Sequence, residues 1–172
     1  MKDVLLNGIL GIITGLISGY IVTIHYRRKD LEREFILYCE RLLKYASCLS
    51  NISMPLKLIH MDANEIIKTL ADIEFPRKYS WLRIPRALKK DAYLVKNVEN
   101  DCNVLFSNLL EYSDALMWSL DLDTTSECRS QHAKIRDEKH KVINEKWMDL
   151  SKDMMQLLKI INGDKVCEKR RS

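Results

Sequence analysis

The feature that most constrains this chain is a stretch from Val4 to Ile24 that carries no charged side chain. Its 21 residues would extend roughly 31 Å as an α-helix, close to the hydrocarbon thickness of a bilayer. A basic cluster at residues 27–29 follows, and positive charge beside a span keeps that end in the cytosol. The sequence therefore predicts a single-pass transmembrane anchor over residues 1–26, with the N-terminus outside and the C-terminal domain cytoplasmic.

Two other interpretations of this stretch are a secretory signal peptide and a buried core helix. The beginning of the chain is nearly neutral, since Lys2 and Asp3 cancel, and no small-x-small cleavage site precedes the basic cluster. Both features argue against a signal peptide. The absence of charge over 21 residues and the abrupt basic flank argue against a core helix.

Small residues recur on one side of the expected span. Residues four apart share a helix face, and such faces allow two helices to approach closely in lipid. Because glycine destabilises a helix interior, by up to about 1 kcal/mol against alanine, a row of glycines suggests a packing role. Glycine is also common in membrane spans without any such role. The residues predicted to mediate self-association of the span, and hence a homo-oligomer, are Gly8, Gly11, Gly15, Ser18 and Gly19.

The remainder of the chain is rich in helix-forming residues, with five glycines and three prolines in 172 residues. Apolar residues at spacings of three and four predict helices at about 27–49, 53–73, 86–120 and up to 161. The third contains a heptad row, typical of a helix packed lengthwise on another. The predicted fold is all-α: one transmembrane helix, then a cytosolic antiparallel bundle of about four helices over 27–163 and a basic tail over 164–172.

The apolar faces of these helices give the expected core. The second helix has Ser53 as its expected cap and Pro55 in its first turn. The fourth is expected to end at Asn162 and Gly163. The expected core positions of the second helix are Leu56, Ile59, Ala63, Ile66, Ile67 and Leu70. Those of the third are Leu88, Val95, Cys102, Leu109 and Leu116, with Val98, Leu105 and Tyr112 beside them. Those of the fourth are Ile143, Trp147, Leu150, Met154, Leu157 and Ile161.

Charge is unevenly distributed although the net charge is only +4. Residues 76–96 contain seven basic side chains and one acid, whereas residues 97–127 contain seven acids and no Lys or Arg. If the helices run up and down, the basic segments meet at the bilayer, where anionic inner-leaflet lipids attract them. A solvated connector is the plain alternative, and nucleic-acid binding is disfavoured because the rest of the chain is not basic. The predicted membrane-surface contacts are Arg27, Arg28, Lys29, Arg77, Lys78, Tyr79, Trp81, Arg83 and Arg86.

No motif for catalysis or for a cofactor is found in the sequence. Cys128 and His132 share a helix face and His140 lies further on, but two ligands on one helix do not make a metal site. There is no Gly-rich phosphate loop, HExxH or GxSxG. The five cysteines lack CxxC spacing and are interpreted as reduced thiols. We therefore expect no catalytic residues, no cofactor and no metal, and a protein that is not an enzyme.

A membrane-anchored helical interaction or adaptor protein, self-associating through its glycine-striped span, accounts best for these patterns. The expected partners are a bilayer with an anionic inner leaflet, a second copy and a cytosolic protein. One alternative is a pore-type effector whose cytosolic bundle controls assembly in the membrane, and another is a membrane-tethered enzyme without a recognisable motif. The architecture resembles the small single-span proteins that bacteria use as membrane-acting effectors or membrane-tethered regulators, and this resemblance assigns no functional residue.

Overall fold

The computed structural model describes the backbone of residues 2–76 and 88–169, and the side chains of residues 12–76 and 88–163. Within these ranges the chain is helical and contains no strand. The helices are α1 (Lys2–Ile52), α2 (Pro55–Leu58), α3 (Ala63–Ala71), α4 (Lys89–Leu120) and α5 (Ser126–Lys169). The predicted all-α fold with a helical bundle is thus confirmed, with a short α2 added to the expected set.

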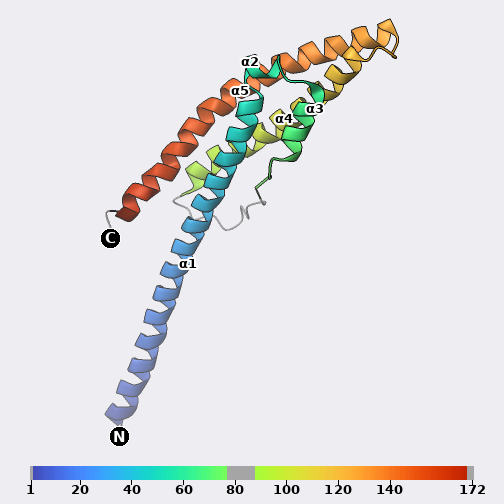
Figure 1. Ribbon diagram of the computed structural model, residues 1–172. Helices are drawn as coiled ribbons and strands as arrows, with labels where there is room; N and C mark the ends of the chain where they lie inside the picture. The colour runs from blue at the N-terminus through green and yellow to red at the C-terminus, as the bar shows by residue number, and fades with distance from the viewer. Residues whose placement is uncertain (1, 77–87, 170–172) are drawn as a thin grey trace.

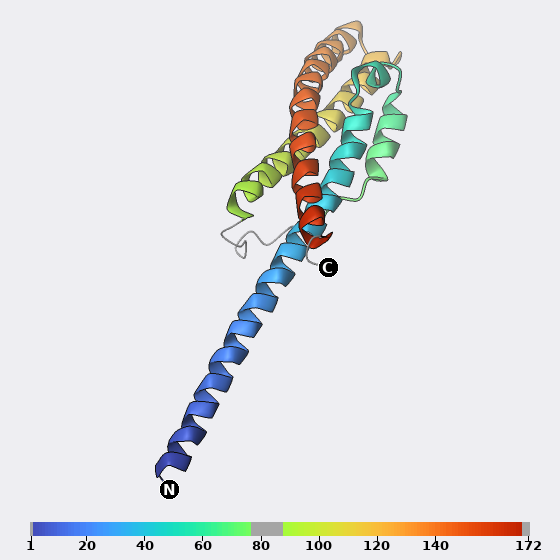
Figure 2. The same ribbon diagram turned by 90° about the vertical axis from the view of Figure 1, so that its left-hand side faces the viewer.

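The helices form an up-and-down bundle from which the first part of α1 protrudes (Figures 1 and 2). Helices α4 and α5 pack lengthwise and antiparallel, and α1 and α3 cover their inner part. The start of α4 and the end of α5 lie at the same end of the bundle as the point where α1 leaves it. The turn between α4 and α5 lies at the opposite, far end.

The core lies between the inner faces of α1, α3, α4 and α5. In α1 the fully buried side chains follow helical spacing, from Phe35 through Leu42 to Leu49. The predicted heptad row of α4 is also confirmed, since Val95, Cys102 and Leu109 are fully buried. The matching positions of α5 that belong to this cluster or pack against it are Ile143, Leu150, Met154, Leu157 and Ile161, and Trp147 is half-buried.

The helix predicted over 53–73 is wrong as one element, because the chain forms a single helical turn and then begins again. The backbone is extended at Met54, before Pro55 opens α2. Ser53 caps nothing, since its Oγ donates to the carbonyl oxygen of Leu49 at 2.8 Å. Asp62 caps α3 instead, accepting from the backbone N–H of Glu65 at 2.7 Å.

This break changes which side chains of the segment are buried. Leu56 and Ile59 were expected in the core, but they are 71% and 60% exposed. Leu58 and Met61 are buried in their place. From Ala63 onward the expected face is correct for Ala63, Ile66 and Leu70, whereas Ile67 is at the surface. The predicted buried face is therefore wrong before the cap residue Asp62 and largely correct after it.

Three helix ends also differ from expectation. Helix α1 continues to Ile52 rather than Leu49, and α4 begins at Lys89 rather than Arg86, which lies outside the described residues. The end predicted at Asn162 and Gly163 is wrong, because α5 continues to Lys169. No described glycine has a positive φ, so Gly163 is an ordinary helical residue instead of a left-handed helix stop.

Candidate functional site

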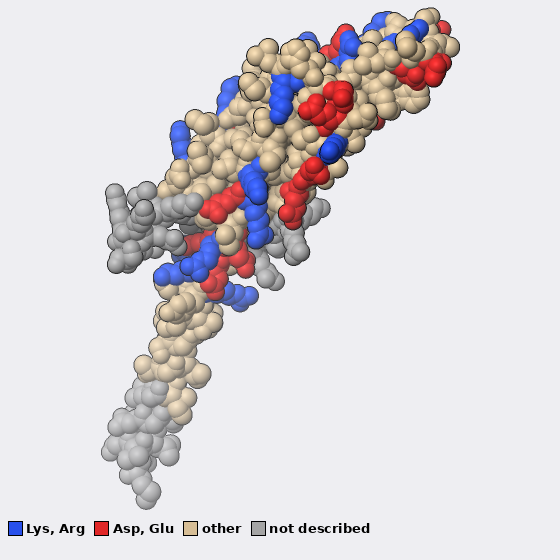
Figure 3. All heavy atoms as spheres, viewed as in Figure 1, with Lys and Arg blue, Asp and Glu red and all other residues tan. Residues whose placement is uncertain are grey.

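The most distinctive surface of the molecule is the protruding segment, residues 12–26 of α1. Every side chain from residue 12 to residue 30 is exposed. Large apolar ones are among them: Ile12 is 66% exposed, Leu16 69% and Ile21 60%. Figure 3 shows no charged side chain on this part of the helix, whereas the bundle carries many on its surface. An unbroken run of exposed apolar side chains is unusual for a surface that faces water.

The hydroxyl groups of the protruding segment bond to its own backbone. Ser18 Oγ donates to the carbonyl oxygen of Gly15 at 3.0 Å, and Thr23 Oγ1 donates to that of Gly19 at 2.7 Å. Such back-bonding satisfies a hydroxyl donor without water or a second helix. These two polar side chains therefore do not oblige the segment to remain in water.

The predicted self-association face is open where the structure describes it. A Cβ added at Gly15 or Gly19 would meet no described atom within 4 Å beyond its chain neighbours and the adjacent backbone of its own helix. Gly8 and Gly11, the other two glycines of the stripe, lie outside the described side chains. Nothing in this chain therefore requires glycine at positions 15 and 19 for space.

The glycine face continues into the uncovered side of α1 within the bundle. Eighteen residues make about five full helical turns, so Arg33 lies directly beyond Gly15 and Leu37 directly beyond Gly19. Both Arg33 and Leu37 are exposed. The core residues of α1 lie on the opposite side of the helix, and a second helix can thus approach the glycines without meeting this bundle.

A charged collar surrounds α1 where it enters the bundle. Arg27, Arg28 and Lys29 are all exposed there. Arg28 Nε donates to Glu32 Oε1 at 3.1 Å, an ion pair one turn apart on the same helix. Figure 3 shows both signs of charge at this level of the molecule. The first three predicted membrane-surface residues are therefore accessible, in a collar of mixed charge.

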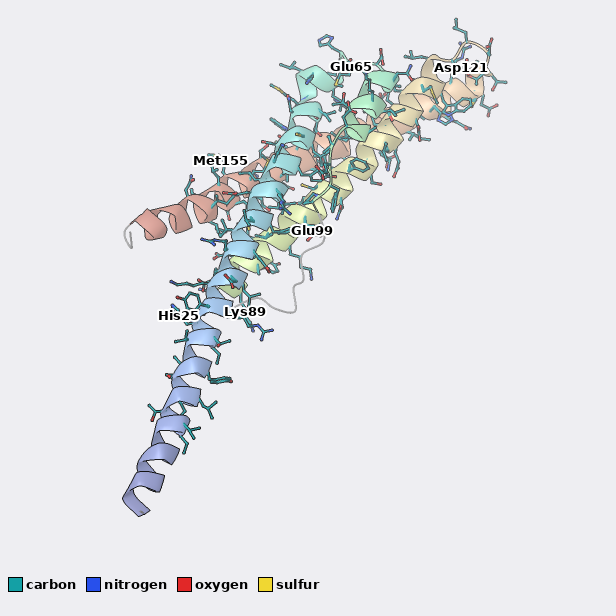
Figure 4. All side chains as sticks on the ribbon, turned by 60° about the horizontal axis from the view of Figure 1, so that its bottom comes forward. His25, Glu65, Lys89, Glu99, Asp121 and Met155 are labelled. Atoms are coloured by element: carbon teal, nitrogen blue, oxygen red, sulfur yellow. The ribbon has the colours of Figure 1, made fainter. Side chains whose placement is uncertain are left out.

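The other predicted membrane-surface residues cannot be placed. Arg77, Lys78, Tyr79, Trp81, Arg83 and Arg86 lie outside the described residues. The structure does place the first residues of α4, which follow them in the chain. Figure 4 shows Lys89 at the end of the bundle from which the protruding segment emerges, at about the level of His25.

The anchor predicted over residues 1–26 is described in part, since its side chains are described from Ile12 onward. Among the residues that the structure describes, no helix combines the length and the apolar character needed to cross a membrane.

Polar contacts inside the bundle join helices to one another. Lys146 Nζ donates to Asp101 Oδ1 at 2.9 Å, linking α5 to α4, and this bond raises the pKa of Lys146. Further along the same two helices, Lys139 of α5 forms an ion pair with Glu111 of α4 and lowers the pKa of that carboxyl group. Trp147 Nε1 donates to the carbonyl oxygen of Ser50 at 3.0 Å, linking α5 to α1. These contacts fix the register of the helices.

Two histidines of α5 lie against aromatic rings of α4. The rings of His132 and Trp118 lie 6.0 Å apart and are stacked, and those of His140 and Tyr112 are also 6.0 Å apart. Within the described part of the chain, no three His, Cys, Asp or Glu side chains converge as a metal site would need. The set of Cys128, His132 and His140 noted in the sequence is thus not brought together with further ligands.

Several Met and aromatic side chains of α4 and α5 are exposed. Met117 and Trp118 are 45% and 43% exposed near the end of α4, and Met148 and Met155 are 51% and 63% exposed on α5. By contrast, Met154 packs on the core. Sequence reasoning missed Tyr93, which is 71% exposed on α4; its spacing shows that it shares a helix face with Lys89 and Lys96, but not that this face is uncovered.

Comparisons with protein-family models, with curated proteins and with solved structures find no match to this chain.

Proposed function

We propose that this chain is a membrane-anchored helical interaction protein, which self-associates through its span and presents its bundle to a cytosolic partner. One observation carries the proposal: the first part of α1 protrudes as an uncharged apolar helix that no other described segment covers. Residues 4–24 contain no charge in the sequence, and basic residues flank their C-terminal end. A bilayer is the environment that accommodates such a surface.

The continuity of α1 supports anchoring. Helix α1 has no break between the apolar segment and the bundle. The basic collar at residues 27–29 therefore follows directly after the last turn of the uncharged segment, which ends at Ile24. In a spanning helix the backbone groups must be satisfied within the helix, as they are here. The N-terminus would lie outside and the bundle on the cytoplasmic side, where basic flanks are retained.

Self-association is supported by the open glycine face and by its continuation along the uncovered side of α1. Small residues allow close backbone contact between helices in lipid. Two copies can meet at Gly15 and Gly19 while their bundles remain on the outer sides of the pair. Replacing Gly15 with Leu would fill this face, whereas Leu16→Ala is a matched change on another face of the same helix.

Membrane extraction tests the anchor. The full chain is expressed in bacterial cells, and membranes are washed with alkaline carbonate, which releases peripheral proteins. The unaltered chain should stay in the pellet, whereas Ile13→Lys combined with Ile17→Lys should release it, because each buried lysine disfavours insertion by about 3 kcal/mol. Ile59→Lys is the matched control, since Ile59 is 60% exposed on the bundle. Release of the unaltered chain would refute anchoring.

A pore-type effector is the alternative that the same face allows, because Thr14, Gly15 and Ser18 give it weak polarity. Against it, the Ser18 hydroxyl is bonded to its own helix, and no charge lines the segment. Membrane potential, followed with a voltage-sensitive dye, separates the two mechanisms. A stable potential supports the tether, whereas depolarisation by the full chain that Gly15→Leu abolishes would favour the pore.

A further inference from the structure

The first turns of α4 carry a basic and aromatic face that none of the described helices covers. Lys89, Tyr93 and Lys96 are spaced by four and then three residues, and therefore lie on one face of α4. All three are exposed, Tyr93 at 71%. Asp91 is half-buried and lies about half a turn away from Lys89, on the other side of the helix. The face thus presents two cations around a tyrosine ring, without an acid among them.

Charge along α4 runs opposite to the order that stabilises a helix. Acids are favourable near a helix N-terminus and bases near its C-terminus, because of the aligned peptide dipoles. Here Lys89 and Lys90 stand in the first turn against one acid, Asp91, and the last turn has no basic residue. Residues 97–127 contain only acids among their charged side chains. A charge arrangement that does not stabilise the helix indicates that these lysines serve a function other than helix stability.

The fold places the basic start of α4 and the turn that follows α4 at opposite ends of the bundle. Figure 4 shows Lys89 near the level of His25, where the protruding segment leaves, and Asp121 at the far end. Figures 1 and 2 show the start of α4 at that same near end in both views. If the protruding segment spans a bilayer, the basic face is beside the headgroups and the turn at Asp121 is remote from them.

We propose that the α4 face formed by Lys89, Tyr93 and Lys96 binds anionic lipid headgroups and so holds the bundle upright on the membrane. The lysine ammonium groups pair with phosphate and carboxylate groups, and the tyrosine ring lies at the interface with its hydroxyl toward water. This inference rests on the proposed membrane anchoring.

Lysine footprinting of the full chain in liposomes tests the inference. The liposomes contain phosphatidylcholine alone or phosphatidylcholine with phosphatidylserine, and a membrane-impermeant amine reagent acetylates exposed lysines before mass spectrometry. We expect Lys89, Lys90 and Lys96 to react at least ~3-fold more slowly on the anionic liposomes, with the difference reduced by high salt. Lys134 and Lys141, which are exposed on α5, should react at the same rate on both.

Paired variants make the result specific to this face. Lys89→Gln with Lys96→Gln should abolish the lipid-dependent protection of Lys90, whereas Lys134→Gln with Lys141→Gln should retain it. Equal acetylation rates on the two liposomes, with the chain floating with both, would overturn this inference and leave anchoring intact. A chain that floats with neither liposome would instead overturn the anchoring on which the inference rests.

Discussion

The two halves of α1 form one unbroken helix in two environments. From residue 12 to residue 30 every side chain is exposed, whereas Phe35, Leu42 and Leu49 are completely buried. Both halves are rich in apolar residues, but only the second alternates them with charged ones at helical spacing. The comparison teaches that apolar content alone does not place a helix in a core. A helix packs on a core when one of its faces is apolar and the opposite face is polar. A helix that is apolar on all sides needs an apolar environment around its whole circumference.

Truncating leucines in the two halves should give the largest contrast. Leu42→Ala is expected to destabilise the bundle by about 2–5 kcal/mol, because it leaves a cavity in the core. Leu16→Ala, at a position 69% exposed, should change the unfolding free energy by less than about 0.5 kcal/mol. Denaturant unfolding in detergent, followed by circular dichroism, measures both. Equal effects would show that the two halves are not distinct.

Alkaline pH should weaken the buried half selectively. Burial raises the pKa of Cys102 and of Tyr45 to about 12 each, from 9.0 and 10.0, and raises that of Tyr38 as well. Because these groups ionise more readily in the unfolded chain, stability is full below about pH 9 and falls as the pH rises toward 12. Thermal unfolding between pH 8 and pH 11 measures the loss.

A matched variant makes the pH prediction specific. Tyr45→Phe removes one of the ionising groups, so its melting temperature should fall less steeply with pH than that of the unaltered chain. Tyr93→Phe, at an exposed position, should leave the slope unchanged. Identical slopes for the unaltered chain and Tyr45→Phe would contradict the assignment of this pH dependence to Tyr45.

The bond between Trp147 and Ser50 connects the buried half of α1 to α5. Replacing Trp147 with Phe removes the indole donor, and the carbonyl oxygen of Ser50 loses this partner. The expected cost is about 1–2 kcal/mol, the size of a lost half-buried hydrogen bond. Trp118→Phe is the control, because Trp118 is 43% exposed and only stacks on His132. Similar shifts in melting temperature for both variants would refute the special role of Trp147.

The smallest expected effect concerns the ion pair between Asp101 and Lys146. Asp101→Asn should cost under about 1 kcal/mol, because the pair is partly exposed to water. A double-mutant cycle with Lys146→Met isolates the interaction, and salt should reduce it. A coupling energy that salt leaves unchanged would show that the pair is held by packing rather than by charge.

Much of the bundle could be predicted because its long helices have regular apolar spacing. The heptad row of α4, with Val95, Cys102 and Leu109, was predicted from the sequence alone and is buried. The break between α2 and α3 was missed, although Asp62 and Glu65 form a recognisable capping signal. That signal was hidden by apolar residues on both sides, which continued the helical pattern through the turn.

Other features required three-dimensional structure. The helical continuation through Gly163 could not be predicted, because an isolated glycine is compatible with either a stop or a continuing helix. The exposure of Tyr93 and of Arg33 depends on how α4 and α1 are rotated against the core. Which side chains share a face follows from spacing, but which face is covered depends on the packing of distant segments.

Hydrogen exchange of the full chain in lipid nanodiscs tests the membrane-anchoring proposal most directly, because it compares the two halves of α1 in one experiment. In a bilayer the amides of residues 12–24 are shielded from water, so they should exchange as slowly as those of residues 35–49 or more slowly. Fast exchange of residues 12–24, while residues 35–49 remain protected, would place the protruding segment in water and contradict membrane anchoring.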